Sequence, residues 1–243
     1  MQDKFEIYKA YKHKFFQEKI ERGVLYIVST PIGNLEDISF RALRVLSQVD
    51  LIAAEDTRVT SKLLNHFGIS KEIISYYSGK EERKLAKILS LLQSGKSIAI
   101  TSDSGTPGIS DPGNYLFSAC VANEIPMRVI PGATSVIQAL VLSTFDSKKF
   151  FFQGFLPRKK GRTKTFSELV NYKMPVVIFE SPYRVEATLK DIYEHFGNKE
   201  ISISRELTKK FEETKRGTLR EFINKKIKIT PKGEFVIIIN NKN

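Results

Sequence analysis

The sequence predicts an α/β protein built from two α/β domains, and three observations support this fold class. Short apolar runs typical of buried strands alternate with segments of helical periodicity along most of the 243 residues. Polar loops rich in Gly, Pro, Ser and Thr follow several of these runs directly, as at the carboxyl edge of a parallel sheet. The pattern then restarts at the aromatic run 150–155, which indicates a second domain.

The first part of the chain predicts a helical extension and a mostly parallel sheet. Residues 1–23 are expected to be the extension, with a helix over 1–22 that ends at Gly23. The first domain, 24–145, opens with a strand over 24–28. Its other expected strands are 50–54, 73–77, 97–101 and 127–130. Its expected helices, placed by apolar residues at helical spacing, lie near 40–49, 59–67, 81–94, 114–123 and 135–142.

The second domain is expected over 149–240. Its predicted strands are 150–155, 176–179, 201–204 and 235–239, and its predicted helices lie near 185–195 and 219–225. The basic segment 158–164 is expected to be a loop, and 205–213 reads as a charged segment.

Composition narrows the classes of function. Lys and Arg exceed Asp and Glu by 39 − 27 = 12, which suggests a polyanionic partner, although a general preference for Lys would raise the charge equally. The only cysteine, Cys120, lies in an apolar segment, and the histidines are scattered, so we expect no metal site and no histidine-based mechanism. No apolar run is long enough for a membrane span and no signal peptide is evident, so we expect a cytoplasmic protein.

Two common nucleotide-binding motifs are not supported. No G-x-G-x-x-G follows the first strand, which argues against a dinucleotide-binding Rossmann domain. Residues 94–97 resemble the end of a Walker A loop, but the upstream glycine is missing and a helix precedes them. Gly95 is therefore expected to end that helix.

Four polar loops are the strongest functional signal: 29–37, 55–58, 101–113 and 131–135. Each follows a predicted strand, so the four are expected to gather at one edge of the sheet. Loop 101–113 is rich in Gly and Pro, which allow close approach of backbone to a ligand and fix the loop. The collection suits a polar ligand with a carboxylate, a ribose and a base, whereas loop 101–113 alone would also fit an ordinary turn.

Seven blocks of sequence, in order, resemble one known family. They are LYIVSTPIGNLEDIS (25–39), EDTR (55–58), TSDSGTPGISDPG (101–113), VIPGATS (129–135), GFLP (154–157), FESPYR (179–184) and RELTK (205–209). This series is similar to the tetrapyrrole methylase superfamily of S-adenosylmethionine-dependent methyltransferases. Within it, the blocks look most like members that methylate a ribose 2′-hydroxyl of a cytidine in small-subunit ribosomal RNA.

The resemblance implies a fold, a cofactor and partners. It implies two α/β domains with S-adenosyl-L-methionine in the cleft between them, a homodimer, and a substrate that is small-subunit ribosomal RNA or the assembled 30S subunit. Carried over by position, the cofactor contacts would be Pro31, Ser102, Asp103, Gly105, Ile109, Ala133, Thr134, Phe179, Glu180, Leu207 and Gly233. For Asp103, a loop-capping Asx-turn is the competing explanation.

Catalytic and RNA-binding residues are expected in the same blocks. Because a ribose hydroxyl must lose its proton, we expect a carboxylate as general base, either Glu206 or Asp56. Lys209 would stabilise the developing alkoxide, and Arg58 would do the same or hold a phosphate. Phosphate contacts are also expected from the basic segment, at Arg158, Lys159, Lys160, Arg162 and Lys164, unless that segment is merely solvated.

Two other functions remain open at this point. The first is a methyltransferase of the same superfamily that acts on a small tetrapyrrole, against which the net charge and the basic segment argue. The second is a non-catalytic RNA-binding or ribosome-assembly factor, which would not need the cofactor loop. The aromatic residues Phe155 and Tyr183 would stack on an extruded base or lie in the core.

Overall fold

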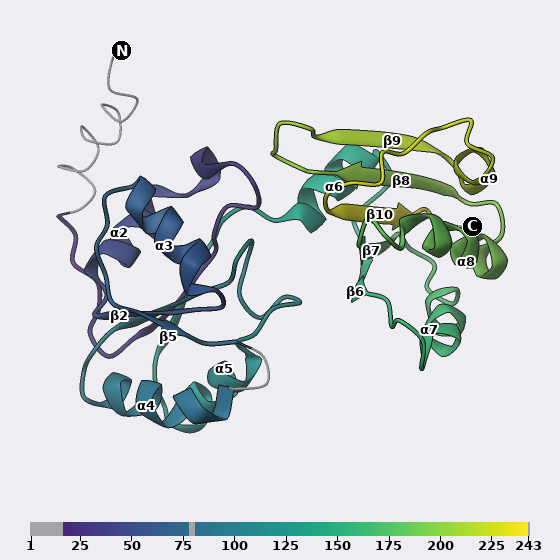
Figure 1. Cartoon of the computed structure of the whole chain (residues 1–243). Helices are drawn as coiled ribbons and strands as arrows, with labels where there is room; N and C mark the ends of the chain where they lie inside the picture. Colours follow the sequence, from purple (N-terminus) through teal and green to yellow (C-terminus); the bar gives the residue numbers. More distant parts are fainter. Residues whose placement is uncertain (1–16, 78–80, 243) are drawn as a thin grey trace, which may run out of the picture. The chain divides into compact units, whose positions relative to one another are not determined.

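The computed structural model describes residues 17–77 and 81–242 (Figure 1). The chain divides into two compact units, Met1–Ala133 and Thr134–Asn243. The sequence placed the first boundary near residue 145. The division lies earlier because the helix that begins at Ser135 packs against the second sheet.

The first unit contains a five-stranded parallel sheet in the order β3-β2-β4-β1-β5. Its strands are β1 (Leu25–Val28), β2 (Leu51–Ala54), β3 (Ile73–Ser75), β4 (Ile98–Thr101) and β5 (Met127–Ile130). Strands β1, β2 and β4 are buried at every position, as expected for a parallel sheet covered on both faces.

Helices cover both faces of this sheet (Figure 1). They are α2 (Phe40–Gln48), α3 (Thr57–His66), α4 (Glu81–Gln93) and α5 (Asn114–Ala122), and a short helix, η1 (Leu35–Asp37), precedes α2. Helices α2 and α3 pack on one face, and α4 and α5 pack on the other. Gly95 follows α4 with φ +84°, as expected for a residue that ends a helix.

The extension before β1 differs from the prediction where it can be described. Residues 17–22 are irregular, so the helix predicted over 1–22 does not reach Gly23. Hydrogen bonds between side chains and backbone hold this stretch: the Glu21 N–H donates to the Tyr26 hydroxyl, and the Ser97 hydroxyl donates to the Glu21 carbonyl. Residues 1–16 lie outside the described residues.

The second unit contains a mixed five-stranded sheet in the order β6-β7-β10-β8-β9. Its strands are β6 (Phe151–Phe155), β7 (Val176–Glu180), β8 (Glu200–Arg205), β9 (Glu213–Thr218) and β10 (Phe235–Ile239). Strands β6 and β7 are parallel, and the other neighbours are antiparallel. The helices are α6 (Ser135–Ser143), α7 (Arg162–Leu169), α8 (Val185–Phe196) and α9 (Leu219–Ile223). Helices α7 to α9 build the core on one face, while α6 packs against β8 and β10.

Two elements of the second unit were not predicted from the sequence. Strand β9 has the polar sequence ETKRGT and lies at the edge of the sheet, where charged residues are common because they discourage further strand pairing. Helix α7 begins inside the basic segment that was expected to be a loop. None of the described helices is long and apolar enough to cross a membrane.

Candidate active site

The first unit brings the carboxyl ends of β1, β2 and β4 together at one edge of its sheet. Strand β4 lies between β2 and β1, so the loops after these three strands are neighbours. The helices that follow β1 and β4 cover opposite faces of the sheet. This divergence of the chain is a topological switch point, the usual place for a ligand in an open α/β sheet.

Hydrogen bonds join the loop after β1 to loop 101–113. Thr30 and Gly105 form an isolated antiparallel bridge, with N–H to carbonyl distances of 2.8 and 3.1 Å. The Thr30 hydroxyl also donates to the Ser102 carbonyl, and the hydroxyls of Ser29 and Thr106 lie 2.8 Å apart. Gly105 has φ +81°, a conformation that favours glycine. Loop 101–113 is therefore held against the loop after β1, and Ser102, near the start of loop 101–113, is buried.

Three carboxylates gather at this edge: Glu55, Asp103 and Asp111. The Asp103 N–H donates to Glu55 Oε2, and Asp103 Oδ1 accepts from the Asp56 N–H at 3.0 Å. Burial raises the pKa of all three groups, and negative neighbours add to the effect. The pKa of Asp111 rises to about 6, although the Ser102 hydroxyl opposes the shift. A cationic ligand at this edge would relieve the repulsion.

The Asp103 side chain thus accepts a hydrogen bond from the Asp56 backbone. This contact is not the Asx-turn that the sequence offered as the competing explanation for Asp103. It links the loop after β4 to the loop after β2 rather than capping its own turn. Asp111 and Glu55 were not singled out from the sequence. Their only signal there was position, since one lies in loop 101–113 and the other directly follows β2.

A cavity of about 400 Å³ opens beside these loops. Its lining combines apolar, hydroxyl, acidic and basic side chains from three segments: Thr30, Pro31, Gly33, Leu35, Val59, Thr60, Lys62, Leu63, His66, Ser102 and Asp103. Three of the expected cofactor residues, Pro31, Ser102 and Asp103, thus share one cavity.

Asp56 begins helix α3 and is bonded to Arg58. Its Oδ1 accepts the Arg58 N–H at 2.8 Å, and the Arg58 guanidinium lies 2.6 Å from Oδ2. Hydrogen bonds from the side chain and backbone of Arg58 lower the pKa of Asp56 to about 2. So acidic a carboxylate is a weak proton acceptor, which argues against Asp56 as a general base.

The loop after β5 completes this edge. An atom at the Cβ position of Gly132 would lie 2.8 Å from Ser29 Cβ, so a side chain there would force the β1 and β5 loops apart. Ala133 ends the first unit, and Thr134 caps helix α6 without a side-chain hydrogen bond. Ile109, another expected cofactor contact, is 55% exposed.

In the second unit, the expected site residues also share one sheet edge. Phe235, at the start of β10, pairs with both Glu180 and Arg205, so β10 begins where β7 and β8 end. Strand β6 is parallel to β7 and ends at the same edge. The residues that this edge brings together are Phe179, Glu180, Glu206, Leu207, Lys209, Gly233 and the basic segment.

Glu180 is buried and fully bonded within the second unit. Its side chain has no solvent exposure. Its carboxylate accepts from the Thr188 hydroxyl at 2.6 Å and the Ser181 N–H at 2.8 Å, and Arg184 lies 3.5 Å away. These bonds hold the turn between β7 and α8, so Glu180 has a structural function whether or not it contacts a cofactor.

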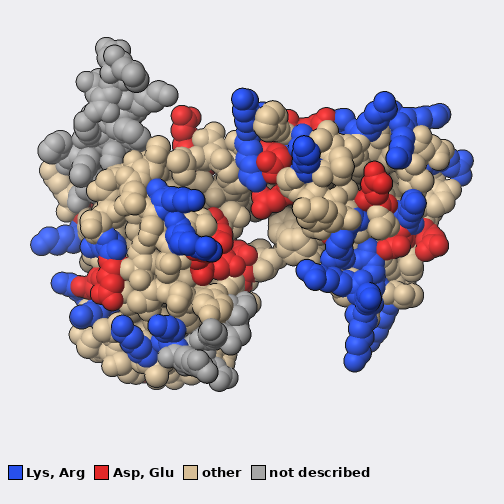
Figure 2. All heavy atoms as spheres, in the orientation of Figure 1, with Lys and Arg blue, Asp and Glu red and all other residues tan. Residues whose placement is uncertain are grey.

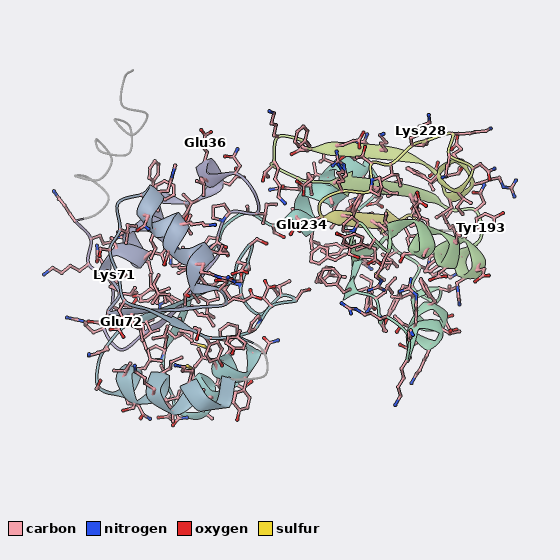
Figure 3. All side chains as sticks on the ribbon, viewed as in Figure 1. Glu36, Lys71, Glu72, Tyr193, Lys228 and Glu234 are labelled. Atoms are coloured by element: carbon pink, nitrogen blue, oxygen red, sulfur yellow. The ribbon has the colours of Figure 1, made fainter. Side chains whose placement is uncertain are left out.

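Glu206 and Lys209 form an ion-pair cluster with Glu234. Glu234 is labelled in Figure 3. The Lys209 ammonium lies 2.9 Å from Glu206 and 2.7 Å from Glu234. Partial burial alone would raise the pKa of Glu206, but Lys209 and the Glu234 N–H outweigh it and lower the pKa. Burial would likewise lower the pKa of Lys209, yet the two carboxylates raise it. A Cβ at Gly233 would collide with the Glu206 side chain, so Gly233 makes room for this cluster.

The basic segment 158–164 contains exposed basic residues and one, Arg162, that is bonded to the rest of the second unit. Arg158, Lys159, Lys160 and Lys164 are exposed. Lys and Arg side chains project from the region of α7 in Figure 2. Arg162 instead lies 2.7 Å from Asp191, and donates to the Thr188 hydroxyl and the Pro157 carbonyl. The structure thus assigns Arg162 to holding the turn that presents its neighbours, rather than to the free surface.

Exposed aromatic rings accompany these cations. Phe155 is 57% exposed at the end of β6 and packs edge-on against Phe179, with ring centroids 5.6 Å apart. Tyr183 is 96% exposed in the turn after β7. The question left open by the sequence is thus answered for Tyr183, which is not a core residue.

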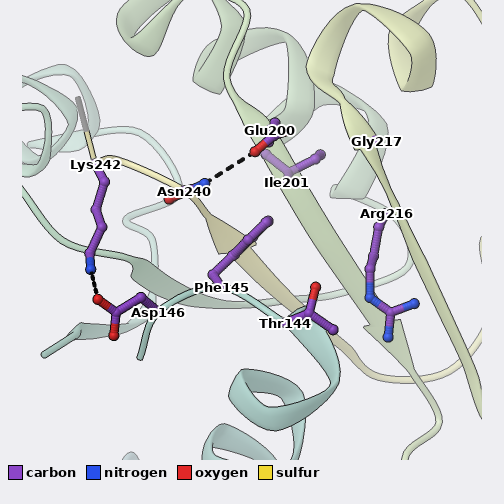
Figure 4. Close-up of a pocket in the computed structure, with 9 residues that line it drawn as sticks. All are labelled: Thr144, Phe145, Asp146, Glu200, Ile201, Arg216, Gly217, Asn240 and Lys242. Carbon is purple, nitrogen blue, oxygen red and sulfur yellow. Dashed lines mark hydrogen bonds and ion pairs between the residues drawn. The ribbon is translucent and has the colours of Figure 1, made fainter. Parts of the chain in front are cut away.

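A second cavity, of about 470 Å³, opens at the opposite edge of the second sheet (Figure 4). Its charged side chains are already bonded within the unit. Lys242 pairs with Asp146, Asn240 donates to Glu200, and Arg216 donates to the Leu142 carbonyl. Among the described residues, no group of three or more His, Cys, Asp or Glu is arranged to hold a metal ion.

The family model for tetrapyrrole (corrin/porphyrin) methylases matches residues 24–223. The chain therefore belongs to the tetrapyrrole methylase family. The resemblance identified from the sequence motifs is thereby confirmed, and so is the expected fold class of two α/β domains.

Individual proteins similar to this chain point to one branch of the family. The chain is 44% identical over 225 residues to the "Ribosomal RNA small subunit methyltransferase I" of Halalkalibacterium halodurans, covering 92% of this chain and 78% of that protein. It is also 44% identical over 220 residues to the protein of the same name from Thermotoga maritima, covering 90% and 99%.

Solved structures share the fold at low sequence identity. Uroporphyrin-III C-methyltransferase from Thermus thermophilus, complexed with S-adenosyl homocysteine, has a TM-score of 0.62 at 16% identity, covering 88% of this chain and 96% of that one. Diphthine synthase has a TM-score of 0.67 at 11% identity, covering 89% of each chain.

Replacing Asp111 by Asn should stabilise the protein at pH 8. In the unfolded chain this carboxyl ionises near pH 3.8, but in the folded protein its pKa is about 6. Its raised pKa therefore favours folding below pH 3.8, and this contribution is lost as the pH rises through 6. We expect a gain of about 1–2 kcal/mol in the free energy of unfolding at pH 8, reduced by partial exposure of the group.

Urea unfolding at pH 8 and pH 4 measures this effect. The gain should shrink to roughly 0.5 kcal/mol or less at pH 4, where Asp111 is neutral in the folded protein but about half ionised in the unfolded chain. The exposed Asp37 serves as a control, since Asp37→Asn should change stability little at either pH. An equal effect of Asp111→Asn on stability at the two pH values would contradict the raised pKa of Asp111.

Proposed function

We propose that this protein transfers a methyl group from S-adenosyl-L-methionine to a ribose 2′-hydroxyl of a cytidine in small-subunit ribosomal RNA. The observation that carries the proposal is the 44% identity, across 92% of this chain, to a protein named for methylating that RNA. The polar loops gathered at the first sheet edge and the exposed cations of the second unit are consistent with it.

The residues at the first edge fit this cofactor. S-adenosyl-L-methionine supplies an activated methyl group on a positively charged sulfur and also carries an ammonium, a carboxylate and a ribose. The carboxylates Glu55, Asp103 and Asp111 suit the positive groups and the ribose hydroxyls. Burial raises their pKa values first and mutual repulsion adds to it, and a bound cation would relieve that repulsion. Pro31, Ser102 and Gly105 would surround it from the two bridged loops.

Methyl transfer to a ribose requires an aligned oxygen and a proton acceptor. The ribose oxygen attacks the methyl carbon in line, the new O–C bond forms as the S–C bond breaks, and S-adenosylhomocysteine leaves. The hydroxyl proton passes to a carboxylate, directly or through water. The pKa of Asp111 is raised to about 6, whereas those of Asp56 and Glu206 are lowered, so Asp111 is the better proton acceptor of these three. Lys209, held by Glu206 and Glu234, would stabilise the developing charge.

The exposed cations and rings of the second unit would hold the RNA. Arg158, Lys159 and Lys160 are free to contact phosphates, and Tyr183 offers a ring on which an unstacked base can lie. Arg162 would contribute indirectly, by fixing the turn.

Reversing two of these charges should weaken RNA binding. The double variant Lys159→Glu, Lys160→Glu is expected to lower the affinity for small-subunit ribosomal RNA about tenfold or more in low salt, and to flatten the dependence of affinity on salt. Filter binding across a salt series measures both. Lys190→Glu is the control for the effect of charge alone, because Lys190 is an exposed residue of α8. Equal weakening by the control would mean that the segment has no special contact with RNA.

The assay for the proposed function is transfer of labelled methyl from S-adenosyl-L-methionine to purified small subunits, to free ribosomal RNA and to a uroporphyrinogen. We expect label in RNA only. Label in the porphyrinogen would favour a tetrapyrrole methyltransferase. RNA binding without any transfer would favour a ribosome-assembly factor.

We further propose that the protein works as a homodimer in the cytoplasm, where small ribosomal subunits are found. The dimer is suggested by the resemblance to the methylase superfamily. Light scattering of the purified protein should give twice the chain mass of 27.7 kDa.

A further inference from the structure

Helix α3 presents a stripe of basic side chains, made of Arg58, Lys62 and His66. Positions 58, 62 and 66 are spaced by four residues and so lie on one face of the helix. All three residues are exposed. Lys and Arg side chains are visible over α3 in the space-filling view, next to acidic ones (Figure 2).

The same face of α3 forms one wall of the cavity in the first unit. Lys62, His66, Val59 and Leu63 line it from the helix. Across the cavity lie Pro31 and Leu35 from the loop after β1. Val59 and Leu35 are each 38% exposed, so the cavity has apolar surface within reach of its cations.

Charge is distributed unevenly along this cavity. Asp103 lies in the part formed by the loop after β4, next to Glu55, whereas Lys62 and His66 belong to the α3 wall. Asp56 neutralises much of Arg58, so Lys62 carries most of the positive charge of the stripe. A bound cofactor with net positive charge suits the Asp103 part, while the α3 wall suits an anion.

We infer that the α3 wall of this cavity binds the RNA strand beside the nucleotide to be methylated. Lys62 and His66 contact its phosphate, and a base or sugar packs on Val59 and Leu35. This inference rests on the proposed function. The position is chemically sensible because the target ribose must lie next to the methyl donor, and Pro31, Ser102 and Asp103 share the cavity with the stripe.

The variants Lys62→Glu and His66→Ala test this contact. Two affinities are measured for each: that for in vitro transcribed small-subunit ribosomal RNA, and that for S-adenosylhomocysteine by calorimetry. We expect Lys62→Glu to weaken RNA binding about tenfold. The slope of log affinity against log salt concentration should fall by roughly the amount that corresponds to one lost phosphate contact. His66→Ala should weaken RNA binding less. Cofactor affinity and melting temperature should stay within twofold and about 2 °C of the wild type.

Lys87→Glu is the matched control, because Lys87 is exposed on α4, which covers the opposite face of the same sheet. Two results would overturn the inference. Unchanged RNA binding in Lys62→Glu, or weakening equal to that of Lys87→Glu, would show no contact at α3. Loss of cofactor affinity with RNA binding retained would assign the whole cavity to the cofactor. Failure of the proposed function is distinguishable, since the wild type itself would then transfer no methyl group to RNA.

Discussion

Asp103→Ala should lower the affinity for S-adenosylhomocysteine about 30- to 100-fold and abolish measurable methyl transfer. The carboxylate lies where the loops after β2 and β4 meet, and it accepts the Asp56 N–H at 3.0 Å. Removing it would take away a charged hydrogen-bond acceptor, worth about 1.5–3 kcal/mol, and leave a backbone donor unpaired. Calorimetry with S-adenosylhomocysteine measures the binding loss without any need for RNA.

Two further variants separate the possible roles of this side chain. Asp103→Asn retains an oxygen for the Asp56 N–H but removes the charge. If the charge holds the cofactor, Asn should bind it nearly as poorly as Ala does. Ser104→Ala, in the same exposed loop, should bind normally. Near-normal binding by Asp103→Ala would remove Asp103 from the cofactor site.

Glu180→Ala should lower the free energy of unfolding by about 3 kcal/mol, the usual cost of breaking a buried ion pair. The Glu180 side chain is fully buried and bonds to Thr188, Ser181 and Arg184. Without it, Arg184 loses its carboxylate and the Thr188 hydroxyl loses its acceptor. Urea unfolding followed by circular dichroism measures the change.

The control is Glu194→Ala, at an exposed position of α8, which should change the free energy of unfolding by less than about 0.5 kcal/mol. Thr188→Val should reproduce part of the loss, because it removes one partner of Glu180. If Glu180→Ala unfolds like the wild type yet binds S-adenosylhomocysteine weakly, Glu180 would be a ligand contact rather than a structural group.

The sequence predicts the first unit well because its strands are apolar and its helices periodic. Strand β1, expected over 24–28, occupies Leu25–Val28, and α5, expected near 114–123, occupies Asn114–Ala122. Strand β9 escaped prediction because pairing with β8, rather than its own polar composition, makes it a strand. Helix α7 escaped because Arg162 is bonded through tertiary contacts to Asp191 and Thr188.

The candidate site was predictable only as a set of loops. Motif position singled out Pro31, Ser102 and Asp103 as cofactor contacts, and the three line one cavity. It did not reveal Asp111, whose pKa depends on burial and on carboxylates distant in the sequence. Motif position also could not show that the side chains of Glu180 and Arg162 form hydrogen bonds within the second unit. A sequence motif does not specify which residues a side chain contacts in the folded protein.

The central claim is ribose methylation of small-subunit ribosomal RNA, and the position of the methyl group tests it most directly. Small subunits from a strain lacking this enzyme would be incubated with the protein and S-adenosyl-L-methionine, and their RNA would be hydrolysed with alkali. We predict a single linkage that becomes resistant, 3′ to a cytidine, because a 2′-O-methyl group removes the attacking hydroxyl. Methyl label on a base, or full cleavage at every linkage, would contradict the account.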